Sequence, residues 1–197
     1  MKAVQKAGGK AISIVGDAAT EETALRCVEA AKQKFGKLDI LINNVGVGNY
    51  KNLVDTSAAE YDEMMDSNVR STFLFTRHSV PLMIEQASGT ILIISSMAGK
   101  YGFPGEAVYC ATKFAQVGFA QALDKELRPL GIKVGLICPG STKAEFALGK
   151  DRTGEAVAAS GMLEPEDVAS AVLLACTQSP RVRIIEVQMR TMDEALT

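Results

Sequence analysis

Residues 90–113, TILIISSMAGKYGFPGEAVYCATK, join an apolar segment to a helical pattern and carry most of the candidate chemistry of the chain. Residues 90–94 form an apolar, β-branched run, which is typical of a parallel strand buried on both faces. Ser95 and Ser96 follow directly, at the carboxyl end of this strand, where open α/β sheets bind their ligands. The segment therefore predicts a buried strand that delivers hydroxyl groups to a site.

Tyr109 and Lys113 lie four residues apart in residues 107–127, which have the pattern of a helix. Residues at i and i+4 share one helix face, so an ammonium would lie beside a phenol. A free tyrosine titrates near pH ~10, and a neighbouring cation favours its phenolate, which makes the pair a candidate general acid/base. A Tyr and a Lys at this spacing also occur on solvated helices, so the pair alone does not establish catalysis.

Together with Asn68 and Ser96, this pair resembles the Asn, Ser and Tyr-x-x-x-Lys signature of the short-chain dehydrogenase/reductase family, which includes the 3-oxoacyl-acyl-carrier-protein reductases. The resemblance covers essentially the whole chain. It implies that Tyr109 is the acid/base and that Ser96 holds the substrate oxygen. Lys113 would contact the nicotinamide ribose and lower the pKa of Tyr109, and Asn68 would support a proton-relay water. A lone Asn in a helix more often faces water or bonds to the local backbone.

The same resemblance implies cofactor contacts after two further strands. Residues 38–42 read as a strand, and the following Asn43-Asn44-Val45-Gly46 is similar to the family's NNAG turn. Asn44 and Gly46 would contact the cofactor there, Gly46 by letting the backbone approach it. Asn43 would bond across neighbouring strand ends. An ordinary Asn/Gly turn is the alternative.

Residues 133–137 read as another strand, followed by Pro139, Gly140 and Thr142, where the family carries PGxVxT. The backbone and Thr142 would contact the cofactor, although Ala144 stands at the position of the family's threonine. Asp17, which follows a strand predicted at residues 11–15, would lie beside the adenine of the cofactor. It could equally be a simple turn residue.

Other signals complete an alternation of strands and helices. Thr20 and Gly36 bound one predicted helix, Ser57 with Glu60 opens another as a capping box, and Pro165 starts a last helix to about residue 177. Residues 183–189 read as a final strand. The alternation predicts an α/β fold, a three-layer Rossmann-like parallel sheet with helices on both faces, in a single domain over residues 1–197.

The family's glycine-rich TGxxxGxG turn and first two strands are absent from the sequence. In a sheet of order 3-2-1-4-5-6, residues 11–15 would be the third strand and residues 38–42 the fourth. We therefore expect the first of these strands to be unpaired and the second to expose an apolar edge. An N-terminally truncated enzyme is favoured over a short protein that has lost its cofactor site. A third possibility is that a segment of another subunit fills the gap.

Composition excludes several classes of function. With 47% hydrophobic residues, 22% charged residues and a net charge of −2, the chain offers no basic footprint for nucleic acid or an anionic membrane. No apolar run approaches the roughly 20 residues of a membrane span, and the first residues lack a signal-peptide core, so we expect a cytoplasmic protein. The four scattered cysteines and the single histidine, His78, predict no metal site.

These observations predict an oxidoreductase that interconverts a secondary alcohol and a ketone with NADP or NAD. Its partners would be a small-molecule alcohol or ketone and, by the resemblance alone, further copies of the chain in a homodimer or homotetramer. The alternative is a non-catalytic interaction protein or subunit that has lost dinucleotide binding, because the glycine-rich turn is absent and Ala144 replaces a threonine.

Overall fold

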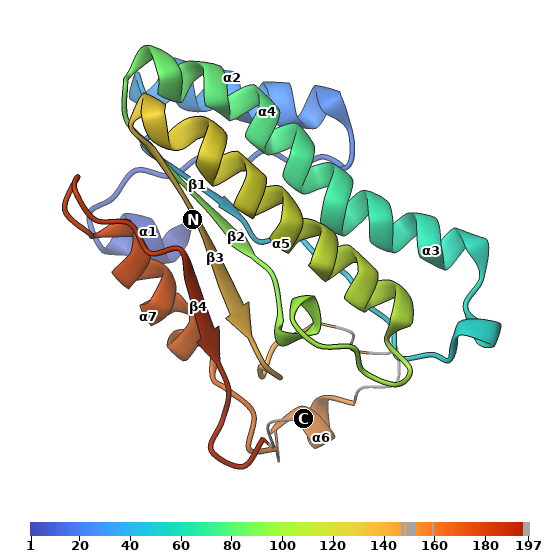
Figure 1. Ribbon diagram of the computed structural model, residues 1–197. Coiled ribbons are helices and arrows are strands. Elements are labelled where there is room, and N and C mark those ends of the chain that lie inside the picture. Colours follow the sequence, from blue (N-terminus) through green and yellow to red (C-terminus); the bar gives the residue numbers. More distant parts are fainter. Residues whose placement is uncertain (147, 149–152, 159, 195–197) are drawn as a thin grey trace.

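A parallel sheet forms the centre of the computed structural model, which describes all residues except 147, 149–152, 159 and 195–197 (Figure 1). The sheet has four strands in the order β1-β2-β3-β4, and each strand is parallel to its neighbours. Because the strands all run in one direction, their carboxyl ends meet at a single edge of the sheet. The strands are β1 (Ile40–Asn43), β2 (Gly89–Ile94), β3 (Ile132–Pro139) and β4 (Glu186–Met189).

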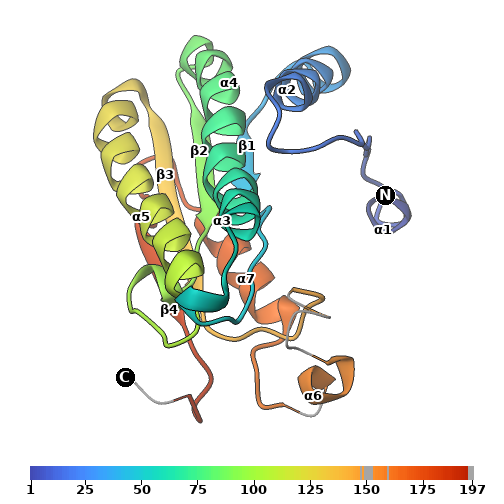
Figure 2. The same cartoon turned by 90° about the vertical axis from the view of Figure 1, so that its right-hand side faces the viewer.

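Helices cover both faces of this sheet (Figures 1 and 2). On one face α4 (Ser71–Glu85) packs against β1 and β2, α5 (Ala107–Leu127) packs against β3, and α2 (Glu21–Phe35) lies beside α4. On the other face α7 (Pro165–Cys176) packs against β2 and β3. This arrangement confirms the predicted three-layer, Rossmann-like α/β fold.

The shorter helical elements connect these layers. They are α1 (Lys2–Lys6), α3 (Ala58–Met65), α6 (Gly154–Ala158), the π-helical turn Asp66–Arg70, and the 3-10 turns Leu53–Asp55, Met97–Gly99 and Arg128–Leu130. The π-helical turn joins α3 to α4 without a break. Figure 2 shows α1 set apart from the sheet, and none of its residues is buried.

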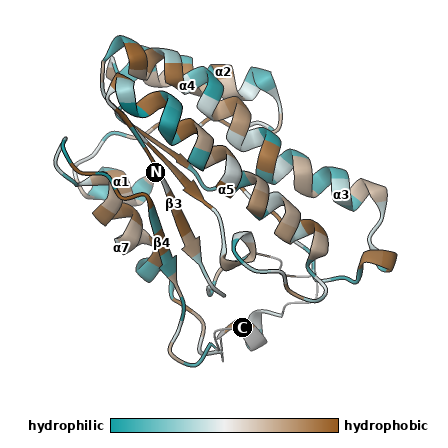
Figure 3. Ribbon diagram, viewed as in Figure 1, coloured by the Kyte–Doolittle hydropathy of each residue, from teal (hydrophilic) through white to brown (hydrophobic). Residues whose placement is uncertain are grey.

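The core has two halves because successive side chains of a strand point to opposite faces. Ile91 and Ile93 of β2 belong to the cluster under α4 and α5, whereas Leu92 and Ile94 belong to the cluster under α7. All four side chains are buried, and Figure 3 shows the central strands as predominantly hydrophobic. This double burial explains the continuous apolar run in the sequence.

The helix boundaries follow the expected capping chemistry. The Thr20 hydroxyl accepts a hydrogen bond from the backbone N–H of Thr23, and Gly36 ends α2 in the left-handed region. Ser57 and Glu60 form both halves of the predicted capping box at α3. The last helix begins at Pro165, as expected. These local signals therefore predicted the helix ends correctly.

Two predicted strands require correction. Residues 11–15 form no strand, because a strand needs a hydrogen-bonded neighbour and β1 pairs only with β2 within the described residues. As expected, β1 exposes an apolar edge, where Ile40 and Ile42 are 40% and 44% exposed. The final strand is only Glu186–Met189, and the side chain of Arg183, just before it, forms an ion pair with Asp124 of α5.

None of the helices in the described part of the chain is long and apolar enough to cross a membrane.

Candidate active site

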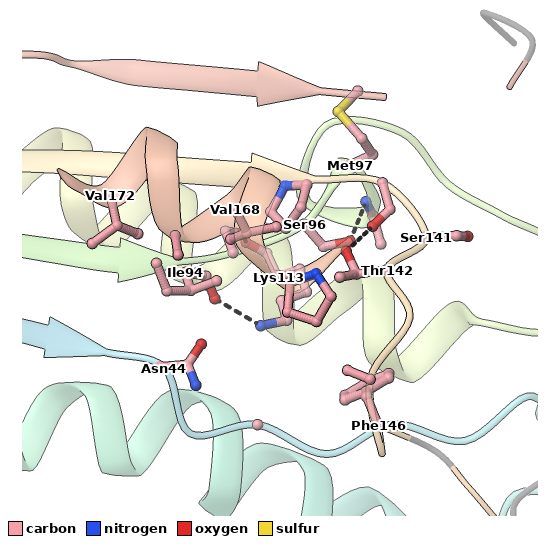
Figure 4. Close-up of a pocket in the computed structure, with 18 of the residues that line it drawn as sticks. Asn44, Ile94, Ser96, Met97, Lys113, Ser141, Thr142, Phe146, Val168 and Val172 are labelled. Atoms are coloured by element: carbon pink, nitrogen blue, oxygen red, sulfur yellow. Dashed lines mark hydrogen bonds between the residues drawn. The ribbon is translucent and has the colours of Figure 1, made fainter. Parts of the chain in front are cut away.

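A cavity of about 1050 Å³ lies at the carboxyl ends of β1, β2 and β3 (Figure 4). Its walls come from the turns after these strands, from the first turns of α5 and from one side of α7. It brings together most of the residues singled out in the sequence. These are Asn44, Gly46, Ser96, Tyr109, Lys113, Pro139, Gly140 and Thr142.

Ser96 lies in the turn after β2 and is held by its own cap. Its Oγ accepts a hydrogen bond from the backbone N–H of Ala98 at 3.1 Å, which opens the 3-10 turn Met97–Gly99. The Ser96 side chain also lies close enough to the Tyr109 side chain, at the start of α5, to lower the pKa of its phenol. The turn and the helix therefore bring two hydroxyl groups to the same cavity.

Lys113 lies one turn further along α5, and its Nζ is 5.6 Å from the centroid of the Tyr109 ring. The ammonium donates to the carbonyl oxygen of Ile94 at 3.1 Å and to Oε1 of Gln116 at 3.1 Å. Figure 4 shows the bond to Ile94. Burial lowers the pKa of Lys113 to about 8, because desolvation disfavours the charged form.

The pKa of Tyr109 is raised from its ordinary value, contrary to the expected lowering by Lys113. Burial of the phenol is the largest cause, and the nearby Ser96 side chain opposes it. Burial therefore outweighs the lowering expected from Lys113, whose ammonium lies beneath the ring and is hydrogen bonded to the oxygens of Ile94 and Gln116. In this structure Tyr109 is therefore a protonated phenol at neutral pH.

Asn68 lies behind the cavity wall, in the π-helical turn, and is fully buried. Its amide exchanges two hydrogen bonds with the backbone of Val47, at 2.7 and 2.9 Å, and donates to Oγ1 of Thr112 at 2.9 Å. Its main-chain carbonyl accepts from Nε2 of Gln116 and from Oγ1 of Thr72, both at 2.8 Å. Asn68 thus ties the turn after β1 to α5.

The turns after β1 and β3 leave space beside these groups. A Cβ at Gly46 would lie 3.2 Å from Oδ1 of Asn68, which is a tight contact, and 3.6 Å from Nζ of Lys113, so a side chain there would crowd the Asn68 amide and fill the space beside the ammonium. Thr142 Oγ1 donates to the carbonyl of Gly140 at 3.1 Å. Asn43 was expected to bond across strand ends, but its amide donates to Thr76 of α4 because the side chain points to that face.

Other candidates lie away from the cavity. The Asp17 carboxylate accepts from the backbone N–H of Ala19 at 2.9 Å in the turn before α2, and Asp17 is not among the described residues that line the cavity. His78 contacts Glu21 of α2 at 3.1 Å. Within the described residues the cysteines are free and no cluster of possible metal ligands occurs.

Three residues near Tyr109 were not predicted from the sequence. The Phe146 ring lies 5.5 Å from the Tyr109 ring, and Tyr50 also lines the cavity. These two residues come from irregular segments, so no periodic pattern pointed to them. The third, Gln116, could have been found, since it follows Tyr109 at i+7 and Lys113 at i+3 and is the polar residue that continues their helix face.

Comparison with known proteins identifies the family. A family model described as short chain dehydrogenase matches residues 1–154. The chain is 37% identical over 142 residues to an uncharacterized oxidoreductase of Thermotoga maritima, a match covering 72% of this chain and 56% of that protein. It is 34% identical over 174 residues to an uncharacterized oxidoreductase of Staphylococcus aureus strain USA300, covering 88% and 73%. The match thus spans little more than half the length of the Thermotoga protein.

Solved structures share the fold and the arrangement of the elements. A metagenomic short-chain oxidoreductase in complex with NADP matches with a TM-score of 0.81 and 29% identity, over 98% of this chain and 79% of that one. A closed form of serine dehydrogenase complexed with NADP+ matches with a TM-score of 0.89 and 26% identity, over 99% and 82%. The chain belongs to the short-chain dehydrogenase family of oxidoreductases.

Proposed function

We propose that this chain carries the catalytic groups of an oxidoreductase that interconverts a secondary alcohol and a ketone with NADP or NAD. The observation that carries the proposal is the convergence of Ser96, Tyr109 and Lys113 on one cavity at the carboxyl edge of the sheet. Their hydroxyl and ammonium groups are the donors that a developing alkoxide needs. The NADP complexes of two related enzymes support the choice of cofactor.

The roles of the side chains follow from their contacts. In ketone reduction a hydride reaches the carbonyl carbon, and the carbonyl oxygen takes a proton. Tyr109 donates that proton from its phenol, and Ser96, which lines the same cavity, positions the same oxygen. Lys113 lies beneath the ring and stabilises the phenolate that the transfer leaves. Alcohol oxidation uses the same groups in reverse.

The cavity fits the nicotinamide riboside end of such a cofactor, which supplies or accepts the hydride when bound. Gly46 leaves open the space beside the Lys113 ammonium, where a ribose hydroxyl could be held. Asn44, Pro139, Gly140 and Thr142 line the adjoining wall. Lys113 is the only basic residue among the described residues that line the cavity, so the structure assigns no partner to the diphosphate.

The substrate side of the cavity is largely aromatic. Phe146 packs on Tyr109 at an interplanar angle of 51°, and Tyr50 and Phe103 line the same region. Apolar walls around a few convergent polar groups are typical of small-molecule sites. We therefore propose a ketone or alcohol with an apolar substituent as the substrate class.

Titration of the 197-residue chain with NADPH and NADH, followed by nicotinamide fluorescence, tests the proposal. Circular dichroism first establishes that the protein is folded. Saturable binding is expected, and Lys113→Met should weaken it by tenfold or more, because about 1.4 kcal/mol, less than one charge-assisted hydrogen bond, corresponds to a factor of ten. The matched control is Lys125→Met, which changes an exposed lysine of the same helix and should bind as wild type does.

The absence of binding by the folded chain would contradict the proposal. It would favour the alternative of a non-catalytic interaction protein or subunit, since the fold would then be kept without its cofactor. Binding followed by turnover of a panel of aryl and alkyl ketones would support the reaction itself.

A further inference from the structure

Gln116 holds a position that the proposed chemistry does not yet use. Its side chain is 1% exposed and lies on the buried side of α5, one turn beyond Lys113. Its Nε2 donates to the carbonyl oxygen of Asn68 at 2.8 Å and to Oγ1 of Thr72 at 3.0 Å. Its Oε1 accepts from Nζ of Lys113 at 3.1 Å. The amide is therefore bonded at both ends in a place that excludes water.

The direction of this amide is fixed by its partners. A glutamine side chain has two donor positions on its nitrogen and an acceptor oxygen. The carbonyl of Asn68 can only accept, and the hydroxyl of Thr72 already donates to that carbonyl at 2.8 Å, so both require a donor from Gln116. The ammonium of Lys113 can only donate. The only orientation that satisfies all three partners turns Oε1 toward Lys113.

Lys113 depends on few acceptors. Of its three N–H groups, one reaches the carbonyl of Ile94 and one reaches Gln116. Lys113 as a residue is 4% exposed, and a buried ammonium is costly unless its hydrogen bonds are made. Its titratable neighbours are Tyr109 on the same helix and Cys138 on β3, and burial raises the pKa of the Cys138 thiol to about 11. Both neighbours therefore stay neutral where Lys113 titrates.

We propose that Gln116 is the positioning residue of Lys113, and that its amide joins the ammonium directly to the main-chain carbonyl of Asn68. The link runs from the π-helical turn through Gln116 to the group beneath Tyr109, and it consists of protein atoms throughout. The catalytic meaning of the inference rests on the proposed function, because Lys113 acts on Tyr109 there. The link itself is a property of the folded chain and can be measured without turnover.

The test measures the titration of Lys113 by NMR in protein with carbon-13 at the lysine Cε, and Lys113→Met identifies the signal. Gln116→Met has a similar volume and no hydrogen bonds. It should lower the pKa of Lys113 by about 1 to 2 pH units, because a hydrogen bond to a charged group is lost. Gln116→Glu places a carboxylate beside the ammonium and should raise that pKa. Gln121→Met, on an exposed position of α5, is the matched control and should leave it unchanged.

Opposite shifts in the two variants support the proposal, since a purely structural role would not change sign with the charge of the side chain. An unchanged titration of Lys113 in Gln116→Met and Gln116→Glu would overturn it. Thr72→Val removes one acceptor of the Gln116 amide and should lower the pKa of Lys113 by a smaller amount. If Gln116→Met does not fold, Gln116→Glu and Thr72→Val decide the question. Failure of cofactor binding or turnover would affect the proposed function and leave this result intact.

Discussion

The side chains of Ser95 and Ser96, adjacent in the chain, have different partners. Ser95 is 4% exposed, and its Oγ donates to the main-chain carbonyl of Lys113 at 3.2 Å. The Oγ of Ser96 accepts a hydrogen bond from the backbone N–H of Ala98 at 3.1 Å, and both serines line the cavity. Successive residues of an extended chain point to opposite sides, so the Ser95 side chain ties β2 to α5, whereas the Ser96 side chain acts on Tyr109.

This difference predicts the outcome of a matched pair of variants. Ser96→Ala removes the group that positions the substrate oxygen and should reduce kcat for ketone reduction by about 100-fold or more. Ser95→Ala should retain most of that activity and lose about 1 kcal/mol of stability, the usual net value of one hydrogen bond. Steady-state kinetics and urea unfolding measure the two effects. Equal losses of activity in the two variants would show that Ser96 has no special role.

Tyr109→Phe tests the proton donor. The change removes one hydroxyl and leaves the ring that packs on Phe146, so the fold and the affinity for NADPH should remain. Loss of a general acid should reduce kcat by about 100-fold to 10,000-fold. Tyr101→Phe, on the loop after β2, is the control and should leave kcat nearly unchanged. Turnover by Tyr109→Phe at the wild-type rate would exclude Tyr109 as the acid/base.

Lys113 should make the stability of the chain depend on pH. Its pKa is lowered from 10.5 to about 8 in the folded chain, so between these values the unfolded state binds more protons. Over this range Lys113 makes the free energy of unfolding rise with pH, by up to about 1.4 kcal/mol per pH unit. Below pH ~8 Lys113 is protonated in both states, so this pH dependence disappears. Urea unfolding at a series of pH values should show this slope as the difference between wild type and Lys113→Met.

The raised pKa values of Tyr109 and Cys138 make the free energy of unfolding fall as the pH rises, because the folded state holds these protons to higher pH than the unfolded state does. Both groups are present in wild type and in Lys113→Met, so their contributions largely cancel in the difference. Lys125→Met should unfold in parallel with wild type at every pH. If the free energy of unfolding of Lys113→Met followed that of wild type in parallel at every pH, the Lys113 ammonium would have to be well solvated.

We predict that substitution by alanine lowers the free energy of unfolding more at Gly131 than at Gly36. Both have a positive φ, 80° and 79°, so alanine is strained at either position by about 1 kcal/mol. At Gly131 a Cβ would also lie 2.6 Å from the carbonyl oxygen of Ala87, whereas at Gly36 no atom lies within 4 Å. Gly131→Ala should therefore cost a further ~2 kcal/mol in the free energy of unfolding. Equal midpoints of urea unfolding for Gly131→Ala and Gly36→Ala would contradict the close packing at Gly131.

Much of the fold and of the site was set by local patterns in the sequence. The alternation of strands with amphipathic helices predicted the parallel sheet, and the signals at Thr20 and Ser57 predicted where two of the helices begin. The carboxyl-end rule for open sheets predicted that Ser96 lies at the edge where the cavity is found, and helical spacing predicted that Tyr109 and Lys113 share one face of α5. These features are predictable because capping and periodicity involve residues close together in the chain.

Only the tertiary structure decided the state of the groups that the sequence brought together. Residues 11–15 have the composition of a strand but form none, because a strand requires a partner that local propensity cannot supply. The raised pKa of Tyr109 and the lowered pKa of Lys113 follow from burial, which depends on segments distant in the chain. The link from Asn68 through Gln116 to Lys113 likewise exists only because α5 packs against the π-helical turn.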